Sequence, residues 1–495
     1  MTEQDTEKGQ PSARESSRIG MNLAALVFAR VATLGMTLVQ MGIIFRELGV
    51  EGSGQFVFAL GYASLFTVFA TLGIQRLLVR DIARNPAIAW TYVWTATGVM
   101  AVLSLAVYAV ITGSIVVLEP NPVVRQAVLL ATLSFVVLWA LQCPFEALLT
   151  ARERMVFIGI VYVVTGALKL LGIFVLLRHM PSSVAAHAIV AASHAIAFLL
   201  CVAFTVYVAG WERPRICLPL AWHQVRESFP FMAAMVCSQV YVKSDMSILK
   251  FMQGDATAGL YGPPQRLIEP ILMIAAIWGT VVFPALCRLS VQSPENYLRL
   301  QRASMRLALF LAFPMAFGLA CLAGPVVRLL AGPGYEESVV VLQLLCVIIP
   351  SFYLNGVGQE LYYAAHRNWY VVSSYALAAV VSVTVNVTCI PYLGVRGVTA
   401  GAIASNIVIS LIFLAGMREA FGSMRLGTFA AKTCLACAAM SVLVRVAEHF
   451  SLVLAVGVGV VAYGGLQLLL HTLDAEERGL AKRLAAECIS RFTRA

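Results

Sequence analysis

Charge is what this chain has least of. Only 12% of its 495 residues are Asp, Glu, Lys or Arg, whereas 60% are hydrophobic, and the mean hydropathy is +0.84. A soluble domain carries about twice that fraction of charged residues. The composition therefore excludes an ordinary soluble protein. The apolar stretches also have the roughly 20-residue length that a helix needs to cross a bilayer.

Motifs for chemistry are missing as well. The chain has no P-loop or other nucleotide motif, which argues against direct use of ATP. The 7 histidines lack metal-ligand spacing, and His187 and His194, which share a helical face, are expected to be packed or capped. The 11 cysteines are scattered, and Cys434 and Cys437 form a C-x-x-C within an apolar helix, where they favour packing. No long polar loop of the kind that a glycan-polymerising membrane enzyme displays is present. These absences favour a transporter without a cofactor over an enzyme.

What the chain does contain is a series of apolar runs separated by short polar breaks. In a membrane such runs must be helical, because the backbone has no water to bond. The pattern predicts an all-α integral membrane protein with about fourteen transmembrane helices. The predicted spans are Leu23–Phe45, Gln55–Gln75, Thr91–Leu118, Ala127–Leu148, Val156–Leu177, Ala185–Ala209, Phe229–Leu249, Gln265–Cys287, Met305–Leu330, Val339–Tyr362, Tyr370–Tyr392, Val398–Met417, Phe429–Val446 and Leu452–Leu470.

The basic residues predict the orientation. Loops on the cytoplasmic side hold the excess of Lys and Arg. If the N-terminus lies inside, more than two thirds of the 35 basic residues fall on inner segments, and each outer segment carries one. We therefore expect both termini in the cytoplasm. The net charge of +10 then reflects topology and not a nucleic-acid partner. The tail from Asp474 is either an amphipathic helix on the inner membrane surface or a solvated tail.

Two segments repeat at one constant offset. LGVEGSGQF follows the first span and QGDATAGLY follows the seventh, and each combines a glycine turn, one acidic residue and an aromatic that opens the next span. The matching residues are Gly49, Gly54 and Phe56 in the first segment and Gly254, Gly259 and Tyr261 in the second. A parallel repeat predicts two pseudo-symmetric six-helix lobes around a central cavity, followed by two C-terminal helices. The predicted division is a cytoplasmic N-terminal segment (1–22), N-lobe (23–209), linker (210–228), C-lobe (229–417), last two spans (418–472) and amphipathic tail (473–495).

The same segments carry a family resemblance. The run RELGVEGSGQFVFALGYASLFTVFATLGIQRLLVRDIAR resembles the opening of Wzx-type polysaccharide flippases. SDMSILKFMQGDATAGLYGPPQRL, and IPYLGVRGVTAGAIASN after Asn386, resemble two further family segments, although Lys250 replaces a common glycine. The family lies in a superfamily with multidrug extruders and lipid II flippases. The resemblance implies a bacterial inner-membrane flippase that moves an undecaprenyl-pyrophosphate-linked oligosaccharide outward. Its implied partners are membrane lipids and, in addition, a polysaccharide polymerase and glycosyltransferases.

Four basic residues fall within the predicted spans: Arg30, Lys169, Lys243 and Arg266. An unpaired charge costs several kcal/mol in hydrocarbon, so such residues usually face a bundle interior or a watery cavity. The repeat places Arg30, Lys243 and Arg266 at the gap between the lobes. There they would clamp a pyrophosphate, with Gln239 extending the polar stripe of Lys243.

Structural alternatives stay open for these basic residues. Arg266 could pair with Glu269 or Asp245, and Lys169 could extend toward the headgroups. Asp245 is expected either to lock its helix to a neighbour or to titrate during coupling to H⁺ or Na⁺. Glu146 and Glu360 are further candidates for coupling or for charges at a helix end.

Two other functions compete with the flippase. A cation-coupled small-molecule extruder of the same fold would carry an acidic coupling residue in the first span, where this chain has Arg30. A non-transporting scaffold for glycan synthesis would not need basic residues in the membrane. Both comparisons favour the flippase.

Overall fold

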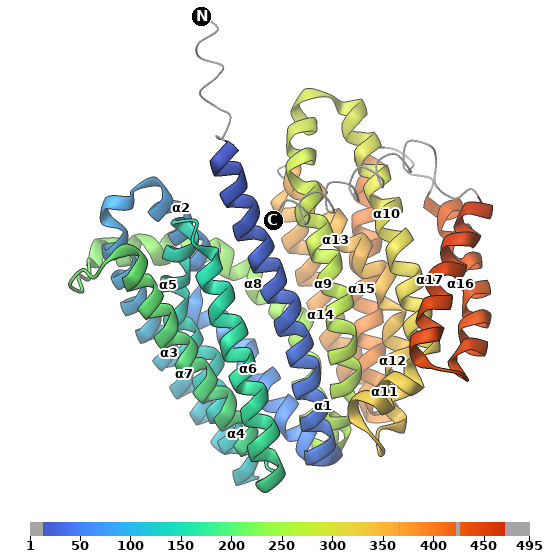
Figure 1. Ribbon diagram of the computed structural model, residues 1–495, viewed down its shortest axis with the longest axis horizontal. Coiled ribbons are helices and arrows are strands. Elements are labelled where there is room, and N and C mark those ends of the chain that lie inside the picture. Colours follow the sequence, from blue (N-terminus) through green and yellow to red (C-terminus); the bar gives the residue numbers. More distant parts are fainter. Residues whose placement is uncertain (1–12, 366, 422–425, 471–495) are drawn as a thin grey trace, which may run out of the picture.

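The apolar segments form helices throughout. The computed structural model describes residues 13–365, 367–421 and 426–470, and every regular element in these ranges is helical. The predicted all-α class is confirmed. Figure 1 shows two helical bundles side by side, the first coloured blue to green and the second mainly yellow to orange, with the start of α1 between them.

The bundles follow the chain order. The first consists of α1 (Ala13–Thr71), α2 (Ile74–Arg84), α3 (Ala89–Leu118), α4 (Pro122–Thr132), α5 (Trp139–Ala151), α6 (Met155–His179) and α7 (Ser183–Ala209), with a 3-10 turn at Pro86–Ile88 and a π-helical stretch at Leu133–Leu138. The second consists of α8 (Leu218–Gln253), α9 (Asp255–Gln292), α10 (Pro294–Cys321), α11 (Ala323–Ala331), α12 (Glu336–Cys346), α13 (Ile348–Ala364), α14 (Asn368–Leu393) and α15 (Val395–Phe421). The last pair, α16 (Leu426–Glu448) and α17 (Leu452–Leu469), packs on α10.

The repeat is visible in the backbone. Gly49 interrupts α1 with φ 64° and ψ −171°, and Gly254 separates α8 from α9 with φ 87° and ψ −178°. Side chains disfavour this positive φ, whereas glycine adopts it freely. Equivalent glycines thus make equivalent turns in the two bundles.

The two turns also pack against each other. A Cβ on Gly54 would lie 1.8 Å from the Asp255 carbonyl oxygen, and one on Gly259 would lie 1.9 Å from the Val50 carbonyl oxygen. Only glycine permits this approach of the two backbones. We call these four residues, with the Gly49 and Gly254 turns that carry them, the turn contact.

The number of spans differs from the expectation. Within the described ranges, ten helices are long and apolar enough to cross a membrane, or eleven if α12 and α13, bent by 41°, form one span. The count of fourteen is therefore not confirmed. One of the ten, Phe28–Thr71, covers most of two predicted spans, and the predicted spans Phe229–Leu249 and Gln265–Cys287, which lie on α8 and α9, are not among the ten. The predicted span Met305–Leu330 is divided at Leu322 between α10 and α11. The chain is nonetheless a multi-pass membrane protein.

Several predicted boundaries also shift. The linker expected over 210–228 is shorter, because α8 begins at Leu218, with a proline in its first turn where the missing N–H is not needed. The linker is tied to α3, since the Trp94 indole donates to the Glu212 carbonyl oxygen at 3.2 Å. The N-terminal segment expected over 1–22 is already helical from Ala13. The tail expected over 473–495 lies outside the described residues.

Candidate functional site

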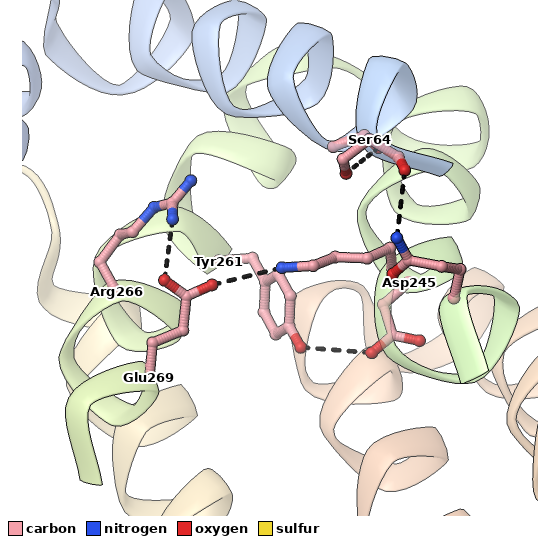
Figure 2. A network of polar contacts seen from close by, with 8 residues as sticks. Ser64, Asp245, Tyr261, Arg266 and Glu269 are labelled. Atoms are coloured by element: carbon pink, nitrogen blue, oxygen red, sulfur yellow. Dashed lines mark hydrogen bonds and ion pairs between the residues drawn. The ribbon is translucent and has the colours of Figure 1, made fainter. Parts of the chain in front are cut away.

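Two basic residues of the second bundle share one carboxylate. On α9, the Arg266 guanidinium donates to Glu269 Oε2 at 2.8 Å, one helical turn apart. Lys243 reaches from α8 to the other oxygen, Glu269 Oε1, at 3.3 Å. Figure 2 shows Arg266 and Glu269 in this network. The Lys243 side chain is 27% exposed, so the group keeps one excess positive charge that a ligand could reach.

Asp245 belongs to a different, buried group. The Asn386 amide donates to Asp245 Oδ1 at 2.9 Å and the Ser382 hydroxyl does so at 3.3 Å, both from α14. The Tyr261 hydroxyl donates to Oδ2 at 3.4 Å (Figure 2). Gly401 on α15 lets Asn386 approach, because a Cβ there would lie 2.0 Å from Asn386 Oδ1. Asp245 therefore joins α8, α9 and α14, as the locking alternative predicts, and Arg266 pairs with Glu269 instead.

Arg30 lies in the first bundle. Its exposed guanidinium stands 4.7 Å from the centre of the Tyr162 ring of α6. It lines a cavity of about 240 Å³ together with Lys169, Gln142 and residues of α1, α6 and α7. Lys169 lies near the middle of α6 (Met155–His179) and contributes to the lining of this cavity.

Glu146 lies behind this cavity. It is buried on α5, where the Gln142 amide donates to Oε1 at 2.7 Å and the Gln75 amide of α2 contacts Oε2 at 3.5 Å. The Tyr162 hydroxyl bonds to it as well, and Arg30 interacts with it electrostatically. The alternative of a solvated charge at a helix end is therefore wrong for Glu146, because helices of the bundle surround it.

The remaining predicted residues are spread over the second bundle. The Gln239 amide donates to the Ser64 carbonyl oxygen of α1 at 3.4 Å (Figure 2), so it bridges the bundles. Glu360 on α13 interacts electrostatically with Tyr375 on α14.

The two groups of basic residues lie near each other across the bundles. Lys169 of α6 is close enough to Arg266 of α9 for the two positive charges to repel each other. The series therefore runs from Arg30 through Lys169 to Arg266 and Lys243. The structure brings together Lys243 and Arg266 of the predicted clamp, but Arg30 contacts Tyr162 instead of them.

One buried ion pair was missed from sequence. Lys250 on α8 binds Glu119, the residue that caps α3, and its Nζ lies 3.5 Å from Asp255 Oδ1. The side chains of Lys250 and Glu119 are only 8% and 5% exposed. The Lys250 amine also lies 5.0 Å from the Phe58 ring. The replacement of a common glycine by Lys250 was the available signal, but nothing in the sequence named Glu119 as its partner.

Solved structures with the same fold are transporters. The lipid II flippase MurJ, in an inward closed conformation, superposes with a TM-score of 0.74 at 13% identity, covering 91% of this chain and 98% of that one. An inward-facing multidrug resistance MATE transporter of the MOP superfamily gives a TM-score of 0.62 at 14% identity, covering 79% and 96%. An outward-facing MATE transporter gives 0.58 at 14% identity, covering 84% and 100%. At these identities the likeness shows the fold alone.

The sequence itself matches a family model. No curated protein matches this chain, but the model described as "Polysaccharide biosynthesis protein" matches residues 19–290, which is more than half of the chain. This range contains both turn glycines and all four basic residues of the predicted spans. The chain belongs to the polysaccharide biosynthesis protein family.

Proposed function

We propose that this protein is a flippase that moves an undecaprenyl-pyrophosphate-linked oligosaccharide across the bacterial inner membrane for surface polysaccharide synthesis. The family supports a role in polysaccharide synthesis, and the fold supports alternating access between two bundles. The lipid-linked cargo is the step that goes beyond both. It is supported by the basic residues inside the two bundles.

The observation that carries the proposal is the series of basic residues across the two bundles. Arg30, Lys169, Lys243 and Arg266 have three nearby carboxylates: Glu269, Glu146 and Asp245, which interacts electrostatically with Lys243. The basic residues outnumber the carboxylates, and an anionic group such as a pyrophosphate would supply the missing negative charge. Charged groups in a membrane are usually retained for a ligand or a transport path. An anionic lipid headgroup accounts for them better than a cationic drug.

Glu269 serves as the counterion of Lys243 and Arg266 when no cargo is bound. Arg266 and Lys243 bind its two oxygens at 2.8 and 3.3 Å. A pyrophosphate offers more oxygens and more charge than one carboxylate, so it competes effectively for the same donors. Cargo binding then exchanges a protein counterion for a ligand, and the cost of exposing bare charges in the membrane is avoided.

The proposal includes a topology. The distribution of Lys and Arg predicts both termini in the cytoplasm, which would put the turn contact on the outer side. We expect a cysteine placed in the Gly254 turn to react with a membrane-impermeant thiol reagent added outside sealed cells. Reaction only after reagent is admitted to the inside would reverse the assignment.

The cargo is tested by reconstitution. Purified protein in vesicles should flip a fluorescent undecaprenyl-pyrophosphate oligosaccharide, and Arg266→Ala should bind undecaprenyl pyrophosphate about tenfold more weakly, since one charge-assisted hydrogen bond is lost. Arg178→Ala is the matched control, because this exposed arginine lies at the end of α6 against Phe174. If wild-type protein binds no lipid pyrophosphate but extrudes a small cation, the extruder alternative is correct.

A further inference from the structure

The serine and threonine hydroxyls that line the cavity beside Arg30 share one orientation. Each donates its proton to a backbone carbonyl of its own helix, one turn earlier. These bonds are Thr33 to Ala29 at 2.8 Å, Thr37 to Thr33 at 2.8 Å, Thr165 to Val161 at 2.7 Å and Ser193 to Ile189 at 2.8 Å. A hydroxyl has one proton and two lone pairs. These four groups therefore present only acceptors to a ligand.

Two further side chains add acceptors to the same cavity. Gln142 is 2% exposed, and its Nε2 is committed to Glu146, whereas its buried Oε1 has no hydrogen-bond partner among the described residues. His194 places Nδ1 2.9 Å from the Val190 carbonyl oxygen. That nitrogen must carry the proton, so the neutral ring leaves Nε2 as an acceptor. The lining calls for a ligand that donates hydrogen bonds.

The same cavity also calls for an anion. Arg30 and Lys169 are donors only, and no Asp or Glu is among the described residues that line the cavity. A pyrophosphate would satisfy the two basic residues but, as an acceptor, would oppose Gln142 and the hydroxyls. A neutral sugar would satisfy the acceptors but would leave Arg30 and Lys169 with only one nearby carboxylate, Glu146, which lies behind the cavity wall. A sugar with a carboxylate satisfies both sets.

The size of the cavity fits one such ring. About 240 Å³ is below the roughly 300–1,000 Å³ of pockets that hold drug-sized ligands. Trp139 and Tyr162 add aromatic surface to the wall, against which the apolar face of a sugar ring can pack. We propose that this cavity binds an acidic monosaccharide of the cargo, its carboxylate between Arg30 and Lys169. This inference rests on the proposed function.

Three lipids test it on the full-length protein in detergent or nanodiscs. They are undecaprenyl pyrophosphate carrying one glucuronic acid, the same lipid carrying one glucose, and the bare lipid. Wild-type protein should bind the glucuronic acid lipid about tenfold more tightly than the glucose lipid, since the charge-assisted bonds differ. Lys169→Gln should abolish this preference, Lys169→Arg should retain it, and Arg178→Gln is the control that keeps it.

The outcomes separate the two proposals. If wild-type protein binds the bare lipid but has no preference between the two sugars, the saccharide site is wrong and the flippase proposal stands. A preference that survives in Lys169→Gln also overturns the site. If none of the three lipids binds, both proposals fall. Should Lys169→Gln fail to fold, Thr37→Cys decides instead. The glucuronic acid lipid should protect this cysteine from a thiol reagent more than the glucose lipid does, and equal protection overturns the site.

Discussion

The turn contact and the membrane interior both contain basic residues, but they differ in how these residues are paired. At the turn contact Lys250 is enclosed by Glu119 and Asp255, and its side chain is 8% exposed. In the interior Lys243, seven residues earlier on the same helix, shares Glu269 with Arg266 and is 27% exposed. Lys250 has two carboxylate partners and is almost fully buried, whereas Lys243 shares one carboxylate with Arg266 and remains accessible to a ligand.

The difference separates a structural charge from a functional one. A buried pair with two carboxylates fixes the bundles at their contact, because either charge alone would be unsatisfied. An interior with more basic residues than carboxylates is stable only if solvent or an anion reaches it. Burial and counterion number, and not residue type, distinguish the two roles.

Lys250→Met is expected to have the largest effect, and it tests whether the buried ion pair of Lys250 stabilises the protein. Removing one partner of a buried ion pair costs about 3–5 kcal/mol, because Glu119 is left buried and charged. We expect a large drop in the midpoint of thermal unfolding in detergent. The double variant Lys250→Met with Glu119→Gln should recover most of the loss, since the more deeply buried of the two carboxylates is then neutral and only the more exposed Asp255 keeps its charge. Equal instability of the single and double variants would show that Lys250 acts by packing on Phe58 and not through the ion pair.

Arg30→Ala is expected to have the next largest effect, and it tests whether the accessible basic residues bind the cargo. Loss of one charge-assisted donor should remove about 1.5–3 kcal/mol, or roughly ten- to a hundredfold in affinity for a lipid-linked oligosaccharide. Because Arg30 is exposed, unfolding should change little. Arg30→Lys should recover part of the affinity, since a point charge replaces a two-pronged donor. Wild-type binding by the alanine variant would assign Arg30 to its stacking contact with Tyr162.

Asp245→Asn distinguishes a lock from a coupling site. The carboxylate accepts from Asn386, Ser382 and Tyr261, so an amide of the same shape keeps much of the packing but loses an acceptor and the charge. If Asp245 binds H⁺ or Na⁺ in the transport cycle, transport should fall about tenfold while the protein still folds. Flipping assays in vesicles with imposed H⁺ or Na⁺ gradients measure this. Loss of thermal stability with wild-type transport in the surviving protein would make Asp245 only a lock.

Glu269→Gln is expected to have the smallest effect, and it tests whether the shared carboxylate competes with the cargo for Lys243 and Arg266. Removing the shared carboxylate frees Lys243 and Arg266 for an anion. The three side chains are 14–36% exposed, and an ion pair with access to solvent is worth about 0.2–1 kcal/mol, so affinity for bare undecaprenyl pyrophosphate should rise by about 1.4- to fivefold. The gain should shrink at high salt, because screening weakens exposed charges. Weaker binding would mean that Glu269 positions the two basic residues and does not compete with the cargo.

The sequence by itself determined the membrane environment, the helical class and the repeat. Hydrocarbon accepts only helices with internal backbone bonds, so apolar length alone predicts them. The turn glycines were also readable, because Gly49 and Gly254 have positive φ that other residues avoid. The four basic residues in the predicted spans, Arg30, Lys169, Lys243 and Arg266, were identified because a charged side chain in hydrocarbon has a high free-energy cost.

Which charged and polar residues pair with each other could be read only from the folded structure. Glu119 and Lys250 are 131 residues apart, and Asn386 and Asp245 are 141 apart, so no local spacing links them. Whether Arg266 pairs with Glu269 or Asp245 depends on how α8 and α9 are rotated against α14. The acceptor-rich cavity likewise exists only because α1, α5, α6 and α7 meet around it. Helical propensity and hydropathy act within one segment, whereas charge pairing depends on which helix faces are brought together.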